Sequence, residues 1–187
     1  MLRLPNLISL LRLVAAPFVA WLLYAGRFRE ALFLLLAAGL TDWLDGYAAR
    51  KLGMINHLGV ILDPLADKVL MVVVFISLGL LQLIPWLLFI MVVVRDLVIV
   101  TGALLLRILR NRREFRPSMM GKVSTFFQIV LALLAVVYAA FPYQFINWLK
   151  ITGVILTAIF TLWSGADYVR QGIQMAKLPA LEPNEAQ

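Results

Sequence analysis

The segment TDWLDGYAAR, residues 41–50, places two aspartates at the end of a long apolar stretch. On a helix, positions 42, 45, 46 and 49 share one face, because they follow the i, i+3, i+4, i+7 spacing. That face carries Asp42 and Asp45 beside Gly46 and Ala49, whose small side chains let a ligand or another backbone come close. The segment therefore predicts a helix with a polar, functional end.

A second acidic segment, GVILDPLADK at residues 59–68, follows after eight residues. Its Gly59, Asp63 and Asp67 are four residues apart and share one face of a helix. Two helices joined by so short a connection are expected to be antiparallel neighbours. The four carboxylates can then converge at one end of the pair.

The amino-acid composition indicates that these helices lie in a membrane. Of the 187 residues, 63% are hydrophobic and 14% are charged, too apolar for a soluble domain of this size. A bilayer core is crossed by about 20 helical residues. Six stretches are long enough: 7–25, 31–50, 58–81, 84–109, 121–141 and 146–170. Breaks between them are expected at Gly26-Arg27, near Gly53 to His57, at Ile84-Pro85, across the basic run after Arg107, and at Phe141-Pro142. We expect an all-α integral membrane protein with six transmembrane helices, forming one catalytic domain over 1–177, and a disordered cytoplasmic tail over 178–187.

The basic residues predict the orientation. One side of the predicted membrane carries only Arg27, Arg29 and Lys150. The other side, with both termini, carries the rest of the loop charges: Arg3, Arg50, Lys51, Arg107, Arg110, Arg112, Arg113, Arg116, Lys122, Arg170 and Lys177. By the positive-inside rule the termini and the acidic segments face the cytoplasm. The net charge of +7 indicates contact with anionic lipids and not with nucleic acid.

Four clustered carboxylates repel one another and are costly inside a membrane. Hard divalent cations such as Mg²⁺ or Mn²⁺ relieve both penalties and prefer oxygen ligands. The chain has no cysteine and one histidine, which argues against zinc. Two cations about 4 Å apart suit a pyrophosphate group.

Other interpretations of the acidic cluster stay open at this point. The aspartates can pair with Lys68 or Arg50 in a purely structural role. Intramembrane carboxylates also mark cation or proton transporters, although no inverted repeat or pair of broken helices is present. Intramembrane prenyl transferases bind metal-pyrophosphate through paired aspartates too, but with other motifs and more spans.

The two acidic segments together resemble a known family signature. The pattern Asp42-x-x-Asp45-Gly46-x-x-Ala49-Arg50, eight residues, then Gly59-x-x-x-Asp63-x-x-x-Asp67 is similar to that of the CDP-alcohol phosphotransferases. The resemblance extends to the six spans, to Pro5-Asn6 and to Arg12, and covers nearly the whole chain. It implies transfer of a phosphatidyl group from CDP-diacylglycerol to an alcohol, with release of CMP, in phospholipid biosynthesis.

The resemblance also implies roles for individual residues. Asp42, Asp45 and Asp63 would bind the divalent cations, and Asp67 would complete the metal site and act as general base. The CDP-lipid would be bound by Asp42, Gly46, Ala49, Arg50 and Gly59. Members of the family commonly form homodimers, and a bacterial chain of this kind would lie in the inner membrane.

The acceptor alcohol is predicted from later segments. LDPLADK, residues 62–68, resembles the branch that holds phosphatidylglycerophosphate synthases and CMP-forming cardiolipin synthases. Arg95-Asp96 and the segment from Arg116 to Lys122 resemble the cardiolipin synthases, which implies phosphatidylglycerol as acceptor; glycerol 3-phosphate stays open. Arg95, Arg116 and Lys122 are expected to bind the acceptor phosphate. Asp96, adjacent in sequence, is expected to point away from Arg95, which leaves a carboxylate of the acidic cluster as an alternative partner of Arg95.

Overall fold

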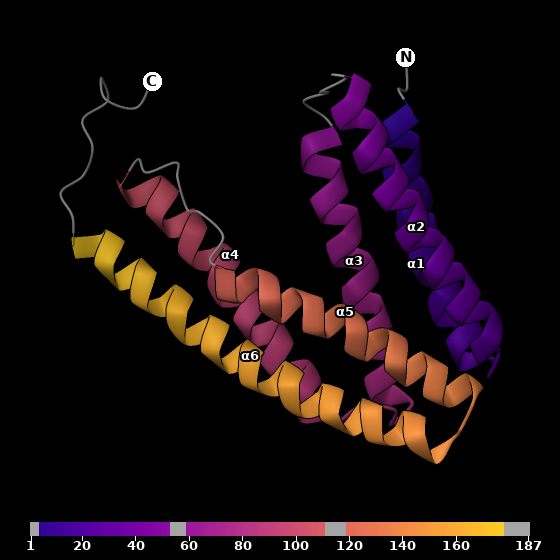
Figure 1. Cartoon of the computed structure of the whole chain (residues 1–187). Helices are drawn as coiled ribbons and strands as arrows, with labels where there is room; N and C mark the ends of the chain where they lie inside the picture. The colour runs from indigo at the N-terminus through magenta and orange to yellow at the C-terminus, as the bar shows by residue number, and fades with distance from the viewer. Residues whose placement is uncertain (1–3, 53–58, 111–118, 178–187) are drawn as a thin grey trace. The chain divides into compact units, whose positions relative to one another are not determined.

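The chain folds into six α-helices, described here from a computed structural model (Figure 1). The structure describes residues 4–52, 59–110 and 119–177, with side chains for 11–41, 68–102 and 119–175. The helices are α1 (Leu4–Tyr24), α2 (Phe28–Leu52), α3 (Gly59–Leu80), α4 (Trp86–Arg110), α5 (Met119–Ala140) and α6 (Gln144–Lys177). The described part contains no strand. The predicted all-α class is confirmed, because each long apolar stretch forms a helix that satisfies its own backbone groups.

Three of the predicted helix breaks are confirmed. Gly26 ends α1 with a φ of 71°, a left-handed conformation that glycine adopts without strain. The amide of Arg27 then bonds the carbonyl of Leu22 at 2.9 Å, as in a glycine-capped helix end. Breaks before Pro85 and at Pro142 separate α3 from α4 and α5 from α6, because proline has no amide hydrogen to donate. The other two predicted breaks fall mostly on 53–58 and 111–118, outside the described residues; α2 ends at Leu52 and α4 at Arg110.

The last helix differs most from its predicted stretch. We expected it to end at residue 170, and it continues to Lys177. The prediction followed hydrophobicity, which falls after Arg170, but Gln, Met, Ala and Lys form helices well without being apolar. Near the start of this extension the side-chain amide of Gln171 donates to the carboxylate of Asp167, one helical turn earlier, at 3.0 Å.

Two compact units can be distinguished, and each is described by itself. The first comprises Met1–Ile84 with Ala132–Lys150. In it α1 packs against both α2 and α3. Both α1 and α3 bury apolar side chains, among them Val19 and Leu23 of α1 and Phe75 and Leu78 of α3. Tight packing of such side chains is what holds helices together where the surroundings are themselves apolar.

The second unit comprises Pro85–Leu131 with Ile151–Gln187, so it contains α4, the first part of α5 and most of α6. Its interior is unusually polar: the buried side chains include Arg95, Ser124, Gln128, Thr157, Thr161 and Ser164. One aromatic pair, Phe127 and Phe160, stacks with ring centroids 4.7 Å apart. Interhelical hydrogen bonds among these polar side chains therefore join the helices of this unit.

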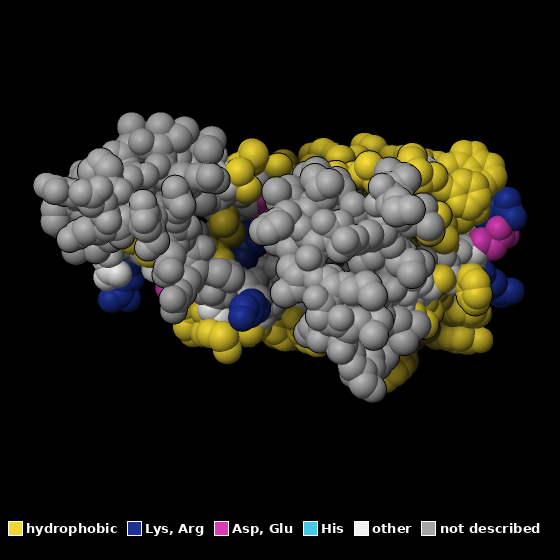
Figure 2. All heavy atoms as spheres, turned by 90° about the horizontal axis from the view of Figure 1, so that it is seen from above, with side chains coloured by type: hydrophobic (Ala, Val, Ile, Leu, Met, Phe, Trp, Pro, Cys, Tyr) yellow, Lys and Arg dark blue, Asp and Glu magenta, His cyan; other side chains and the backbone are white. Residues whose placement is uncertain are grey.

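Apolar side chains make up much of the described surface on the face seen in Figure 2, as expected for a protein that lies in a membrane. Large side chains such as Phe33, Leu87, Phe126 and Trp163 are exposed. Within the described residues, Met119–Ala140 and Gln144–Met175 are long and apolar enough to cross a bilayer, and Leu11–Tyr24 and Lys68–Leu80 are shorter apolar segments. The six helices are confirmed. That all six cross the membrane, and that 1–177 form one domain, stay predictions.

Candidate functional site

The four aspartates lie on two helices of the first unit. Asp42 and Asp45 belong to α2, and Asp63 and Asp67 belong to α3. The predicted helical spacing therefore holds, and each pair shares one face of its helix. The helices run in opposite directions on either side of 53–58, and both pack against α1 (Figure 1). Side chains from 42 to 67 are outside the described part, so their convergence stays a prediction.

The donor set suits a hard divalent cation. Carboxylate oxygens are the ligands that Mg²⁺ and Mn²⁺ prefer, and the two pairs offer four such groups on successive helices. Elsewhere, among the side chains that the structure describes, no three His, Asp or Glu residues gather into a metal site. The acidic pairs on α2 and α3 are thus the candidate metal centre of this chain.

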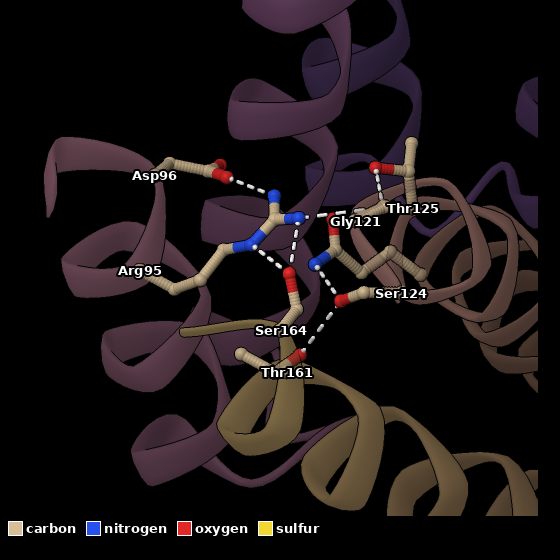
Figure 3. A network of polar contacts seen from close by, with 8 residues as sticks. Arg95, Asp96, Gly121, Ser124, Thr125, Thr161 and Ser164 are labelled. Atoms are coloured by element: carbon tan, nitrogen blue, oxygen red, sulfur yellow. Dashed lines mark hydrogen bonds and ion pairs between the residues drawn. The ribbon is translucent and has the colours of Figure 1, made fainter. Parts of the chain in front are cut away.

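Arg95 of α4 is the centre of a polar network in the second unit (Figure 3). Its side chain is 7% exposed. Nε and Nη2 both donate to the hydroxyl of Ser164 on α6, at 3.1 and 2.8 Å. Nη2 also donates to the carbonyl of Gly121 on α5, at 3.3 Å. One arginine thereby bonds to two further helices, and its planar fork of five N–H groups makes this possible.

Asp96 completes this network and corrects one expectation. Nη1 of Arg95 donates to the Asp96 carboxylate at 2.8 Å, so the two side chains form an ion pair with little exposure. We expected Asp96 to point elsewhere on the helix, and that was wrong. Long arginine side chains can fold back toward a neighbouring residue, which residue spacing on a helix does not take into account.

A line of buried hydroxyl and amide groups joins α5 to α6 in the same unit (Figure 3). The hydroxyls of Ser124 and Thr161 lie 3.4 Å apart. The amide of Gln128 donates to Ser124 at 3.3 Å, and Thr157 donates to the carbonyl of Phe127 at 3.1 Å. Such bonds fix the register of two apolar helices, because a slipped register would leave polar groups unsatisfied.

Gly121 allows the closest approach in this network. A Cβ built on Gly121 would lie 2.6 Å from the phenolic oxygen of Tyr168 and 3.2 Å from Nη2 of Arg95. The guanidinium carbon of Arg95 also lies 5.5 Å from the centre of the Tyr168 ring. Sequence analysis missed Gly121, Ser164 and Tyr168. Their residue types are common in membrane helices, and their proximity arises only when three helices pack together.

The other predicted acceptor residues are placed differently. Lys122 follows Gly121 on α5 and is exposed. Arg116 lies outside the described residues. Arg95 is buried and bonded within its own unit. The structure therefore places Arg95 and Lys122 in quite different surroundings, although α4 and α5 meet at Gly121.

Comparison with known proteins points to one family. The family model described as CDP-alcohol phosphatidyltransferase matches residues 2–163. The chain is similar to the CDP-diacylglycerol–glycerol-3-phosphate 3-phosphatidyltransferase of Aquifex aeolicus (strain VF5), with 34% identity over 93% of this chain and 98% of the relative.

Two longer relatives are similar over a part of their length. The rat cardiolipin synthase (CMP-forming) is 32% identical over 92% of this chain and 63% of the relative. A chloroplastic CDP-diacylglycerol–glycerol-3-phosphate 3-phosphatidyltransferase of rice is 35% identical over 75% of this chain and 48% of the relative. The chain thus spans about half to two thirds of these longer proteins.

Proposed function

Because the chain belongs to the CDP-alcohol phosphatidyltransferase family, we propose that it transfers the phosphatidyl group of CDP-diacylglycerol to a glycerol-bearing alcohol and releases CMP. The observation that carries this proposal is the position of the acidic signature: its two halves fall on α2 and α3, inside the matched region. Family membership favours a transferase over the ion transporter that the carboxylates alone left open.

The proposed metal ligands are Asp42, Asp45 and Asp63, with Asp67 completing the site. Four carboxylates on two helices fit Mg²⁺ or Mn²⁺, and we propose two such ions. When bound, they would neutralise the charge of the pyrophosphate. The aspartates would hold these ions at the cytoplasmic edge of the helices, so that the diphosphate of the lipid could be bound there despite its negative charge.

Asp67 is proposed as the general base. The oxygen of the acceptor hydroxyl forms a bond to the phosphatidyl phosphorus, and the bond from that phosphorus to the oxygen of CMP breaks. CMP leaves with the electron pair, and the hydroxyl proton passes to the Asp67 carboxylate. This role requires the carboxylate to come within hydrogen-bond reach of the hydroxyl.

Small residues and one arginine are proposed to bind the nucleotide part of the donor. Gly46, Ala49 and Gly59 leave space beside the aspartates on their helix faces. Arg50 follows one residue after Ala49 and would grip a phosphate oxygen through its planar donors. Asp42 would contribute to the same CDP-lipid site.

The acceptor phosphate is proposed to meet Lys122 and Arg116, with a different role for Arg95. Four of the five N–H groups of Arg95 are committed or shared: one to Asp96, two to Ser164 and one to Gly121. A phosphate could replace these partners only if the junction of three helices opened. We propose that Arg95 is a positioning residue, which holds the first turn of α5 so that Lys122 faces the acceptor.

Two acceptors are in question. Phosphatidylglycerol, which would give cardiolipin, is favoured by the Arg95-Asp96 pair and by the segment leading to Lys122. Glycerol 3-phosphate is favoured by a relative of the same length: the match to the Aquifex protein, named for that substrate, covers 98% of the relative. Both offer a glycerol hydroxyl and a phosphate, so the same aspartates and Lys122 would serve either one.

A substrate panel tests the proposal. Purified full-length protein with Mg²⁺ or Mn²⁺ is given CDP-diacylglycerol with each acceptor, and CMP is measured. Release with phosphatidylglycerol alone identifies a cardiolipin synthase, and release with glycerol 3-phosphate alone identifies a phosphatidylglycerophosphate synthase. If neither acceptor gives CMP, the proposed function is wrong. Ion flux in proteoliposomes without a nucleotide lipid would then support the transporter.

Further proposals concern the setting of the enzyme. We propose a multi-pass protein, in a bacterial inner membrane, with termini and aspartates on the cytoplasmic side, because the basic loops gather on that side. We also propose a homodimer, on the family resemblance. Besides a second copy of the chain, the proposed partners are the substrates and membrane lipids, and no nucleic acid is proposed.

A further inference from the structure

One end of the first unit combines exposed aromatic rings with basic side chains. The rings are Trp21 near the end of α1, Tyr143 just before α6 and Trp148 in its first turns; they are 51%, 68% and 62% exposed. Arg27 precedes α2, Arg29 lies in its first turn, and Lys150 lies near the start of α6. Aromatic rings of this kind mark the level of lipid headgroups. This end of the unit is therefore where phosphate groups of a bilayer would be found.

A hollow of about 260 Å³ opens at this end. It is lined by residues 26–30 of the α1–α2 turn and by Ala139 and Ala140 of α5. The two alanines leave space beside the turn because their side chains are short. A volume of several water molecules, each about 30 Å³, accommodates a phosphate group with part of its hydration.

Arg27 and Glu30 form an internally neutral pair at the hollow. Nε of Arg27 donates to Oε1 of Glu30 at 2.8 Å, and Nη2 pairs with Oε2. Both carboxylate oxygens are thus engaged by one guanidinium, a bidentate arrangement. The pair adds donors to the wall of the hollow without adding net charge.

Arg29 supplies the remaining positive charge. Its guanidinium carbon lies 5.0 Å from the centre of the Phe141 ring, which holds the cation against an apolar surface. Among the side chains that the structure describes, no carboxylate pairs with it. The hollow therefore carries one positive charge that no ion pair neutralises. A phosphodiester carries one negative charge, so the two match.

We propose that this hollow binds the phosphodiester of an anionic phospholipid, at a site separate from the acidic helices. Asp42 follows Arg29 on α2 by 13 residues, or about 20 Å of helix at about 1.5 Å per residue. The lipid would lie in the leaflet opposite the aspartates, with its phosphate on Arg29 and its chains along the exposed face of α1. The proposal is independent of the reaction that the aspartates carry out.

Quenching of Trp21 tests the proposal, because the Arg27 guanidinium lies 5.6 Å from that ring. Full-length protein in phosphatidylcholine nanodiscs receives brominated phosphatidylglycerol or brominated phosphatidylcholine, and the Trp21→Phe variant isolates the signal of Trp21. The anionic lipid should quench at a lower mole fraction than the zwitterionic lipid. Arg29→Gln should reduce this preference about fivefold, the usual effect of one basic residue at a membrane surface.

Further charge variants separate an effect on lipid binding from an effect on folding. Arg29→Lys keeps the charge and should retain most of the preference, whereas Glu30→Gln frees Arg27 and should strengthen it. Arg170→Gln removes an exposed basic residue of the second unit and should change nothing. An unchanged preference in Arg29→Gln, or a weaker one in Glu30→Gln, would overturn the site. Equal displacement by millimolar inorganic phosphate would overturn the lipid as its ligand.

Discussion

Gly121 and Tyr168 approach each other so closely that a Cβ on the glycine would lie 2.6 Å from the tyrosine oxygen. Arg95 lies on the same side, because its Nη2 would be 3.2 Å from that Cβ. Overpacking of this kind costs about 1–3 kcal/mol, more than the ~1 kcal/mol that alanine gains over glycine in a helix. We therefore expect Gly121→Ala to lower the melting temperature of the purified protein by several degrees.

A matched glycine provides the control. A Cβ on Gly102 of α4 would meet no atom within 4 Å, so Gly102→Ala should melt at the same temperature or slightly higher. Tyr168→Phe removes the nearest atom and should restore part of the stability of Gly121→Ala. Equal melting of both alanine variants would show that α5 and α6 can separate without cost, against the packing described.

The sequence predicted those features that depend on one segment at a time. Apolar length predicted six helices, and glycine and proline predicted the breaks at Gly26, Pro85 and Pro142. The spacing of Asp42 and Asp45 predicted their shared helix, which is confirmed. Contacts between helices far apart in the chain were missed: Ser164 is 69 residues from Arg95 and binds it all the same. No local pattern specifies which hydroxyl a buried arginine will reach.

Arg95 yields a second prediction, which distinguishes positioning from direct contact. Lysine keeps the charge near Asp96 but lacks the fork that reaches both Ser164 and Gly121. Loss of these buried bonds costs about 1–3 kcal/mol. Arg95→Lys should therefore melt earlier and show a raised KM for the acceptor, measured by CMP release at varied acceptor concentration.

Ser164→Ala distinguishes the two explanations of a raised acceptor KM, positioning of α5 by Arg95 and direct contact between Arg95 and the acceptor. If Arg95 acts by holding α5, removal of its hydroxyl partner should raise the acceptor KM in the same direction. If Arg95 touched the acceptor itself, Ser164→Ala would leave the KM unchanged. Ser77→Ala is the matched control, because the buried Ser77 hydroxyl donates only to Val73 of its own helix, at 2.8 Å. That variant should behave as the wild type.

Metal dependence gives a third prediction, centred on the acidic helices. Treatment with EDTA should abolish CMP release, and Mg²⁺ or Mn²⁺ should restore it, because all the proposed ligands are carboxylates. Asp42→Asn should raise the metal concentration needed for half-maximal activity at least tenfold, about 1.4 kcal/mol. Asp167→Asn alters an aspartate that bonds Gln171 on α6 and should leave the metal requirement as it is. Full activity in the presence of EDTA would show that the reaction needs no divalent cation, against the proposal.

Asp67→Asn provides the last prediction, because asparagine keeps the size of the side chain but cannot accept the proton of the acceptor hydroxyl. Loss of a general base lowers turnover about 10²–10⁴-fold. We expect kcat to fall by that order while the affinity for CDP-diacylglycerol, measured by equilibrium binding with Mg²⁺ present, changes little. Asp45→Asn should weaken binding and turnover together, because Asp45 is assigned to the metal alone. Both aspartates lie on helices that pack against α1, so the melting temperature of each variant checks that folding is retained. Equal loss of binding in Asp67→Asn would reassign Asp67 to the metal and leave the proton to another group.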